Sequence, residues 1–358
     1  MDGVRVGMRW WARSALLVLV LVTIAGCQPT EKPATAPKSQ PTQPPIGSAP
    51  SQPPALLCGG PSGQACRLSL FATEPEDGVV PFADRLNQAT VTIDFAPFLL
   101  DAPGIIQALV NARQRGVRVR LLTEPSHDKD NARALKVLGA AGAEIRSGNP
   151  TFGLTHAKYA VLDGSRSLIM TFNSTMKELP THRDFAIEDT NPNDAQFFQE
   201  LFNADWDRTA VGSIPDGFAL SPDNADQVLP TLVRSAQRSL DVYAEKLEAS
   251  PLMDAILDDA RRGVAVRILA DEPNHGKVPK PLLDLARRGQ LQIRVPSNLG
   301  VHAKVIVLDG TTAYFGSENI EDAVGDRRRE LGLMFEDGSI VGYLRQVFDR
   351  DWAAPAES

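Results

Sequence analysis

The amino-acid sequence predicts an α/β protein made of two similar α/β/α sandwich domains, an internal duplication that forms a pseudo-dimer. Apolar runs typical of buried strands alternate with amphipathic helical segments from about residue 80 to residue 353, which indicates sheets covered by helices. The pattern recurs after about 146 to 149 residues, a period too long for a solenoid. The tripeptide His-Ala-Lys also occurs once in each repeat, at residues 156–158 and 302–304.

The composition is that of a globular, slightly acidic protein. Of its 358 residues, 43% are hydrophobic and 23% are charged, and the formal net charge is −7. Proteins that bind nucleic acids generically usually carry a basic excess, so this composition argues against that class. A local basic groove on an acidic protein remains compatible with it.

The N-terminus predicts an export signal over residues 1–26. Three arginines precede the apolar run "SALLVLVLVTIAGC", which is too short to span a bilayer comfortably as a permanent helix. The run ends in a sequence that resembles the lipobox of bacterial lipoproteins, which implies that Cys27 is lipidated and becomes the mature N-terminus. An ordinary cleaved signal and a short membrane anchor with an incidental cysteine are the alternatives. The lipobox implies a lipid-anchored protein of the bacterial cell envelope, and Gln28 after the cysteine resembles outer-membrane sorting in Gram-negative lipoproteins.

Residues 27–57 predict an extended tether. They are rich in Pro, Ser, Thr and Gln and nearly lack large apolar side chains, so they cannot bury a core. Cys58 and Cys66 flank the turn-rich segment that follows, and in an oxidising compartment we expect them to form a local disulfide rather than a zinc site.

The first half is assigned to residues 58–222. Apolar residues recur at helical spacing in the segment 101–116, and Gly116 marks the end of this helix. A strand and a loop with Glu124 and His127 follow. A second helix, a short strand, the strand that carries His-Ala-Lys, two further strands and a closing helix complete the half.

The second half, residues 223–358, repeats this order. Ser250 is the expected N-cap of its first helix, Pro251 suits the first turn, and Gly263 marks the end. An equivalent loop contains Glu272 and His275. The histidine of each half is followed 50 residues later by a tryptophan of the closing helix: Trp206 follows His156, and Trp352 follows His302.

The two His-Ala-Lys sequences place ionisable side chains in apolar surroundings. Residues i and i+2 of a strand share a face, so each histidine and its lysine point the same way. Because burying such groups unpaired costs several kcal/mol, we expect them to line a site or to hold an anion. The segment Gly316-Ser317-Glu318-Asn319 on the neighbouring strand offers a hydroxyl and an amide as donors to phosphate-like oxygens. A single His-Ala-Lys is more often a structural pair, but its recurrence with the downstream residues favours a site.

These residues resemble the HxK…D…GSxN motif of the phospholipase D superfamily. The second half matches it fully, in His302, Lys304, Asp309, Gly316, Ser317 and Asn319. The first half matches in His156, Lys158, Asp163 and Asn173 but has Met170 and Thr171 where glycine and serine are expected. Thr171 keeps the hydroxyl, whereas Met170 lacks the small size of glycine, so we expect a crowded or altered first site.

The resemblance implies one active site at the interface of the two halves. One histidine attacks phosphorus and the other protonates the leaving alcohol, and water then hydrolyses the phosphohistidine. His156 is the implied nucleophile and His302 the implied general acid, with lysines and asparagines holding the phosphate oxygens. Asp184 and Glu330, each 28 residues after a histidine, are implied to orient the histidines. No cofactor or metal is implied, and we expect Asp163 and Asp309 to close the turns before the glycines that follow them.

The implied function is that of a phospholipase D-like phosphodiesterase that hydrolyses or transfers phosphodiesters. An acidic chain tethered to a membrane favours phospholipids over nucleic acids as substrates, and no obligate protein partner is evident. A metal-independent nuclease is one alternative, and a degenerate, non-catalytic anion-binding member, suggested by Met170 and Thr171, is the other.

Several other residues have two interpretations. His127 and His275 rim the pocket, cap helices or are exposed to solvent, and the run at 326–330 either binds phosphate or is a solvated surface. The aromatic residues of the motif strands and closing helices are expected in the core: Tyr159, Tyr314, Trp206 and Trp352.

Overall fold

The structure is a computed structural model that describes residues 68–271, 278–321 and 327–355. The export signal, Cys27, the tether, Cys58, Cys66, Glu272 and His275 lie outside the described residues. No helix within the described ranges is long and apolar enough to cross a membrane.

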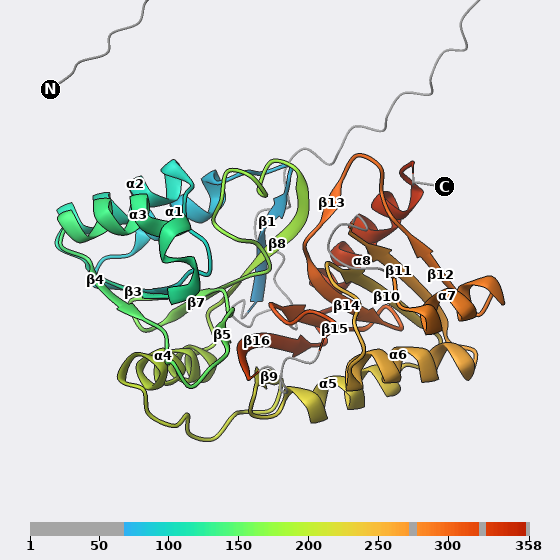
Figure 1. The fold of residues 1–358 in the computed structure, drawn as a ribbon. Coiled ribbons are helices and arrows are strands. Elements are labelled where there is room, and N and C mark those ends of the chain that lie inside the picture. Colours follow the sequence, from blue (N-terminus) through green and yellow to red (C-terminus); the bar gives the residue numbers. More distant parts are fainter. Residues whose placement is uncertain (1–67, 272–277, 322–326, 356–358) are drawn as a thin grey trace, which may run out of the picture. The chain divides into compact units, whose positions relative to one another are not determined.

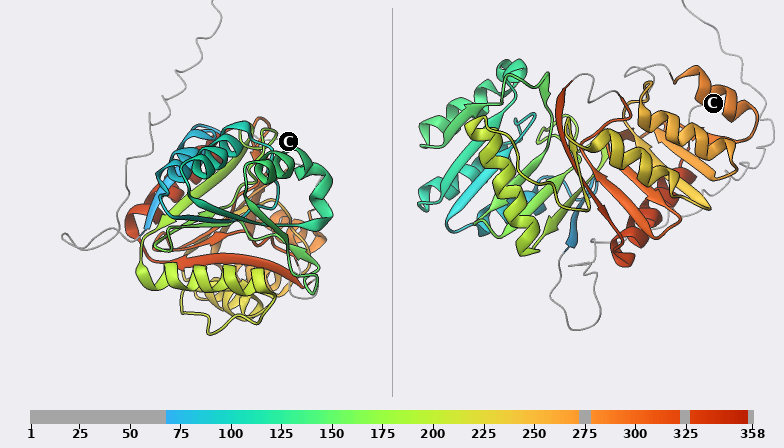
Figure 2. Two further views of the ribbon diagram at one scale, coloured as in Figure 1. Left: turned by 90° about the vertical axis from the view of Figure 1, so that its left-hand side faces the viewer. Right: turned by 90° about the horizontal axis from the view of Figure 1, so that it is seen from below.

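The first half forms a mixed sheet with the strand order β1-β8-β7-β6-β2-β3-β4. Its elements are β1 (Leu68–Glu74), α1 (Val80–Gln88), β2 (Thr92–Ala96), α2 (Pro103–Gln114), β3 (Arg118–Thr123), η1 (Pro125–His127), α3 (Asp128–Ala140), β4 (Glu144–Ser147), β5 (Leu154–Thr155), β6 (Tyr159–Leu162), β7 (Arg166–Met170), β8 (His182–Asp189) and α4 (Pro192–Asp207). Helices α1, α2 and α3 cover one face of the sheet and α4 covers the other (Figure 1). The left view in Figure 2 shows the same three layers from the side.

The second half repeats this plan with the strand order β12-β11-β10-β14-β15-β16. Its elements are β9 (Phe218–Ser221), α5 (Ala225–Arg234), β10 (Ser239–Ala244), α6 (Pro251–Arg261), β11 (Ala265–Ala270), α7 (Lys280–Arg287), β12 (Leu291–Arg294), β13 (Gly300–Val301), β14 (Lys304–Leu308), β15 (Thr312–Gly316), β16 (Arg328–Phe335) and α8 (Gly338–Ala353). The predicted duplicated α/β class is therefore confirmed. Strand β9 pairs with β16, so the second sheet begins at Phe218, just before the boundary predicted after residue 222.

The helix ends follow the sequence signals closely. The Ser250 hydroxyl accepts a hydrogen bond from the backbone N–H of Met253 at 3.1 Å, and Pro251 is the first residue of α6. Gly263, just after this helix, has a φ of +94°, which residues other than glycine rarely adopt. Helix α2 likewise ends at Gln114, two residues before Gly116.

Two short strands cross from one half to the other. Strand β5 of the first half pairs in parallel with β16 of the second, and β13 of the second half pairs in parallel with β8 of the first. Each of these strands ends just before a His-Ala-Lys sequence. The sequence predicted the tripeptide at 156–158 within a strand, and this is corrected, since it lies in the connection between β5 and β6.

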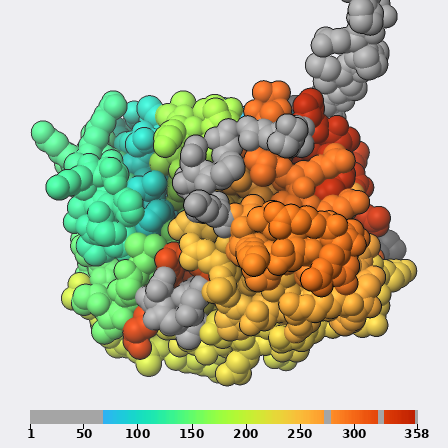
Figure 3. Space-filling view, turned by 45° about the vertical axis from the view of Figure 1, so that its right-hand side comes forward, coloured from blue at the N-terminus to red at the C-terminus, as the bar shows by residue number. Residues whose placement is uncertain are grey.

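The halves share one hydrophobic core. It combines residues of the closing helices, such as Phe198 and Phe202 of α4 and Leu344 and Phe348 of α8, with inward-facing strand residues of both sheets. Separate cores lie under the outer helices of each half. Figure 3 shows the surface on which the first half, in cyan and green, meets the second half, in yellow to red.

Two buried arginines add ion pairs across this interface. Arg183 Nε of β8 donates to Asp351 of α8 at 2.7 Å, and Arg329 Nη2 of β16 lies 3.2 Å from Asp205 of α4. Each arginine therefore contacts the closing helix of the opposite half. A buried ion pair becomes costly when one partner is removed, so these contacts favour one relative placement of the halves.

Candidate active site

The crossing strands bring both histidines to the interface. The backbone N–H groups of His156 and Ala157 donate to the carbonyl oxygen of Arg329 at 2.9 and 2.8 Å. The N–H of Ala303 donates to the carbonyl of Arg183 in the same way, at 2.9 Å. Each histidine is thus held against the strand of the opposite half that carries a predicted orienting carboxylate, β16 with Glu330 or β8 with Asp184.

The two predicted orienting carboxylates are exchanged between the halves. His156 Nδ1 lies 2.8 Å from Glu330 Oε1, and His302 Nδ1 lies 3.1 Å from both carboxylate oxygens of Asp184. Both carboxylates are fully buried. Because an ionised carboxylate only accepts, each histidine donates its Nδ1–H and turns Nε2 toward the site.

The motif hydroxyls contact these carboxylates. Thr171 Oγ1 donates to Asp184 at 2.6 Å, and Ser317 Oγ donates to Glu330 at 2.6 Å. The expectation that they donate to phosphate oxygens is therefore corrected, since their protons are used by the acids that orient the histidines. Threonine reproduces the serine contact, so this departure from the motif leaves the arrangement intact.

Met170 does not crowd the site, which corrects a second expectation. Its side chain is buried in the core under α1 and α2. Its counterpart Gly316 has no room for a side chain, because a Cβ there would lie 2.5 Å from the Tyr314 hydroxyl, 2.6 Å from the Gly332 Cα and 2.7 Å from the Leu331 carbonyl oxygen. In the first half, Leu168 stands at the position of Tyr314 and Ala186 at that of Gly332, and the buried Met170 is accommodated between this strand pair and the core.

The first half presents a neutral imidazole beside a lysine. Lys158 Nζ lies 2.9 Å from His156 Nε2 and also donates to the His156 carbonyl at 2.9 Å. Burial lowers the pKa of His156 to about 4 against the opposing attraction of Glu330, and the Lys158 charge adds to the lowering. Burial also lowers the pKa of Lys158 to about 7, helped by the ammonium of Lys304 from the other half.

The second half has a different neighbour at its histidine. Glu245, just after β10, places Oε2 2.5 Å from Lys304 Nζ and 3.6 Å from His302 Nε2. Burial alone would raise the pKa of Glu245, but Lys304 and His302 hold it well below its usual range. The equivalent position in the first half is Phe98, whose ring packs edge-on against His156 at 4.6 Å.

Of the two motif asparagines, Asn173 contacts a motif histidine. Asn173 Nδ2 lies 3.4 Å from His302 Nε2 and donates to Glu178 at 2.7 Å. Asn319 is buried, and the side-chain oxygens of both asparagines have no hydrogen-bond partner within the described residues. Sequence reasoning missed Glu178, Glu245 and Phe98. Aligning "DFAPFLL" with "DVYAEKL" would have revealed the difference between the last two.

The motif aspartates lie outside the site, as expected of structural residues. Asp163 and Asp309 both have a φ of +53° in the turns before Gly164 and Gly310. The Asp163 carboxylate accepts the backbone N–H groups at the start of β2, and that of Asp309 accepts those at the start of β10. Burial opposes ionisation, yet these N–H groups lower the pKa of both carboxyls.

Of the remaining candidate residues, one lines a pocket beside the site and the others make structural contacts. His127 packs edge-on against Phe98 at 4.6 Å and, with Glu178, lines a pocket of about 290 Å³. Arg328 pairs with Glu321 at 2.6 Å, so like Arg329 it is held by a carboxylate rather than free in solvent. Tyr159 and Tyr314 are buried, and the two tryptophans stack on phenylalanines of their own helices.

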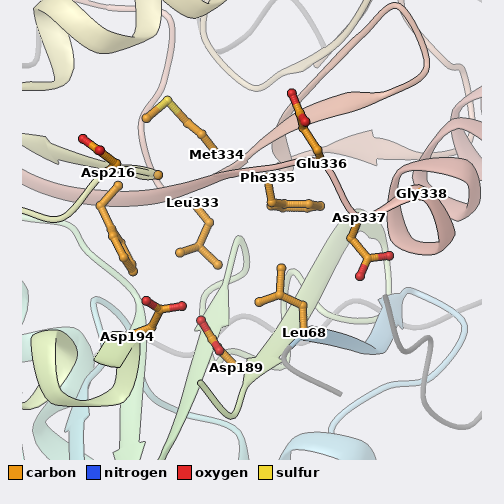
Figure 4. A pocket seen from close by; sticks show the side chains of 12 residues that line it. Leu68, Asp189, Asp194, Asp216, Leu333, Met334, Phe335, Glu336, Asp337 and Gly338 are labelled. Carbon is orange, nitrogen blue, oxygen red and sulfur yellow. The ribbon is translucent and has the colours of Figure 1, made fainter. Parts of the chain in front are cut away.

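A larger pocket, of about 420 Å³, lies elsewhere at the junction of the halves (Figure 4). It contains none of the motif residues and is rimmed by carboxylates. Asp337 accepts the N–H groups of Ser339 and Ile340 at the start of α8, and Asp189 accepts that of Asn191 before α4. Since these carboxylates serve as helix and turn caps, we assign the chemistry to the histidine site. Among the described residues, no group of three or more His, Cys, Asp or Glu is placed to hold a metal ion.

Comparison with known proteins matches both halves. A family profile described as "Cardiolipin synthase, PLD-like domain" matches residues 82–206 and again residues 229–352. Phospholipase D Z of Dictyostelium discoideum is 32% identical over 129 residues, covering 34% of this chain and 28% of that protein. Mitochondrial cardiolipin hydrolase of Chlamydomonas reinhardtii is 26% identical over 149 residues, covering 42% of this chain and 65% of that protein. The matches thus span less than two thirds of either relative. The crystal structure of phosphatidylserine synthase from Haemophilus influenzae shares the fold, with a TM-score of 0.61 at 13% identity, covering 82% of this chain and 88% of that chain.

Proposed function

The chain belongs to the PLD-like phosphodiesterase family described as cardiolipin synthase, PLD-like domain, and we propose that it cleaves phosphodiesters through a phosphohistidine on His156. One feature supports this above all others. Two histidines from opposite halves have Nδ1 fixed by buried carboxylates, and their Nε2 atoms face lysine, asparagine and glutamate side chains. Such a pair can supply a nucleophile and a proton donor to one phosphate.

The proposed reaction has two steps. His156 Nε2 attacks phosphorus, the bond to the leaving alcohol breaks, and His302 gives its proton to that alcohol. Water then gives a proton to His302 and attacks phosphorus, which breaks the nitrogen–phosphorus bond and releases the phosphate monoester. Lys158, Lys304 and the motif asparagines stabilise the charge on the non-bridging oxygens. Replacing water with a second alcohol turns hydrolysis into transfer.

We propose a phospholipid as the substrate. The relatives named as phospholipase D and cardiolipin hydrolase support this class. The non-catalytic alternative was suggested by Met170 and Thr171, but Met170 lies in the core and Thr171 makes the serine contact. A nuclease remains an alternative that the assay below distinguishes.

Turnover is expected to survive chelation, because lysines and asparagines surround the phosphate position. The measurement is turnover of a phosphatidyl lipid, cardiolipin and single-stranded DNA, each with and without EDTA. Vanadate, which mimics pentacoordinate phosphorus, is expected to inhibit it. Turnover that EDTA abolishes and magnesium or zinc restores would contradict the metal-free mechanism, and turnover of DNA alone would favour the nuclease.

The pH dependence of kcat/KM is expected to have limbs near pH 4 and pH 7. Protonation of His156 below its pKa of about 4 removes the attacking lone pair. Deprotonation of Lys158 above its pKa of about 7 removes a charge that holds the phosphate. Bound phosphate favours the ammonium, so the alkaline limb of kcat should lie at higher pH. In Lys158→Arg the guanidinium stays charged and the limb near pH 7 should vanish, while a wild-type profile that stays flat from pH 7 to 9 would refute the assignment.

We further propose that the protein is anchored to the bacterial envelope through lipidated Cys27. The apolar run before this cysteine ends in a lipobox-like sequence. Fatty-acid labelling of the full chain should label the wild type and spare Cys27→Ser. Equal labelling of the two, or a Cys27→Ser protein that still sediments with membranes, would count against the anchor.

A further inference from the structure

The site is asymmetric at one pair of equivalent positions. Phe98 follows β2 and packs against His156, whereas Glu245 follows β10 and approaches His302. Strands β2 and β10 occupy equivalent positions in the two halves. Asp94 of β2 pairs with Arg120 of the next strand, and Asp241 of β10 pairs with Arg267 in the same way. The two halves therefore place an apolar ring and a carboxylate at the same point beside otherwise similar histidines.

The two Nε2 atoms consequently face opposite charges. His156 Nε2 lies 2.9 Å from the Lys158 ammonium, which favours a lone pair on that nitrogen. His302 Nε2 lies 3.6 Å from Glu245 Oε2, which favours a proton there. The other groups around His302 are Asp184 at Nδ1, the Asn173 amide at 3.4 Å from Nε2, and Lys304.

Glu245 also neutralises the lysine beside this histidine. Its Oε2 lies 2.5 Å from Lys304 Nζ, and the side chain is only 14% exposed, so water screens the pair weakly. The Lys304 charge would otherwise oppose a proton on His302. At the equivalent point, Lys158 lies over the face of Phe98, 5.1 Å from the ring centre, and finds no carboxylate from that position.

We propose that Glu245 is the positioning residue that keeps a proton on His302 Nε2 and so makes His302 the general acid. This inference rests on the proposed function. A residue outside the duplicated motif thereby determines which histidine is the general acid and which is the nucleophile. Phe98 at the equivalent position leaves His156 as the nucleophile.

The kinetic test compares Glu245→Gln with the wild type on two phosphodiesters, an alkyl ester and a nitrophenyl ester. The alkyl alkoxide needs a proton to leave and the nitrophenolate does not. We expect kcat on the alkyl ester to fall about 100-fold. On the nitrophenyl ester, the rate of phosphohistidine formation should fall by less than about threefold. KM should not rise, because Lys304 is released to the phosphate. Glu245→Asp should recover most of the loss, and Glu248→Gln, an exposed carboxylate on the same segment, should behave as the wild type.

Nitrogen-15 NMR of labelled histidine tests the same inference without turnover. The His302 Nε2 signal should show more of the protonated nitrogen in the wild type than in Glu245→Gln under the same conditions. Equal losses on both esters with a raised KM would show that Glu245 only holds Lys304. No loss on the alkyl ester, or identical His302 signals in the two proteins, would also overturn the inference. A wild type inactive on both esters would instead refute the proposed function, and the NMR comparison would still decide the role of Glu245.

Discussion

Alanine in place of His156 or of His302 is expected to lower turnover of an alkyl phosphodiester by about 10⁴-fold or more. Each half supplies one histidine, and cleavage needs both a nucleophile and a proton donor. The measurement is steady-state turnover of the purified full chain. Loss of half the activity in either variant would instead indicate two independent sites.

The two variants should differ in a rapid-quench experiment. His302→Ala can still form the phosphohistidine from a nitrophenyl ester and should accumulate it, because it lacks the group that activates water. His156→Ala cannot form it. Acid-labile phosphate should therefore map to the peptide that contains His156, and phosphate found on His302 would reverse the roles.

Substitution of each buried carboxylate is expected to impair the histidine of the opposite half. Glu330 contacts His156 and Asp184 contacts His302, so Glu330→Gln should slow formation of the phosphohistidine on any ester. Asp184→Asn should slow the first step mainly on alkyl esters, where His302 must donate a proton. We expect losses of about 10²-fold to 10⁴-fold, since each variant loses the acceptor that fixes the imidazole. Single-turnover rates on the two esters measure both effects.

The motif aspartates provide matched controls for these carboxylates. Asp163→Asn and Asp309→Asn remove a charge from turns outside the site, so they should lower thermal stability while leaving kcat close to the wild-type value.

Sensitivity to the leaving group in Glu330→Gln but not in Asp184→Asn would contradict the exchanged pairing.

The architecture was largely predictable because its signals are local. Apolar spacing, the Ser250 cap and Gly263 define helix ends from residues close in the chain, and the recurrence of His-Ala-Lys reveals the duplication. The role of Met170 was not predictable in this way. Whether a methionine fits there depends on how closely the paired strand and the neighbouring side chain approach this position, which is a property of the folded sheet.

The sequence by itself determined the family, the two halves and the residues that each contributes, since these follow from motifs and spacing within one half. Only the tertiary structure decided how the halves share them. Glu330 and Asp184 lie at equal distances along the chain from their own histidines, so spacing cannot tell which histidine each acid reaches. Pairing of β5 with β16 and of β13 with β8 settles the matter, because backbone hydrogen bonds across the interface set each histidine beside the acid of the other half.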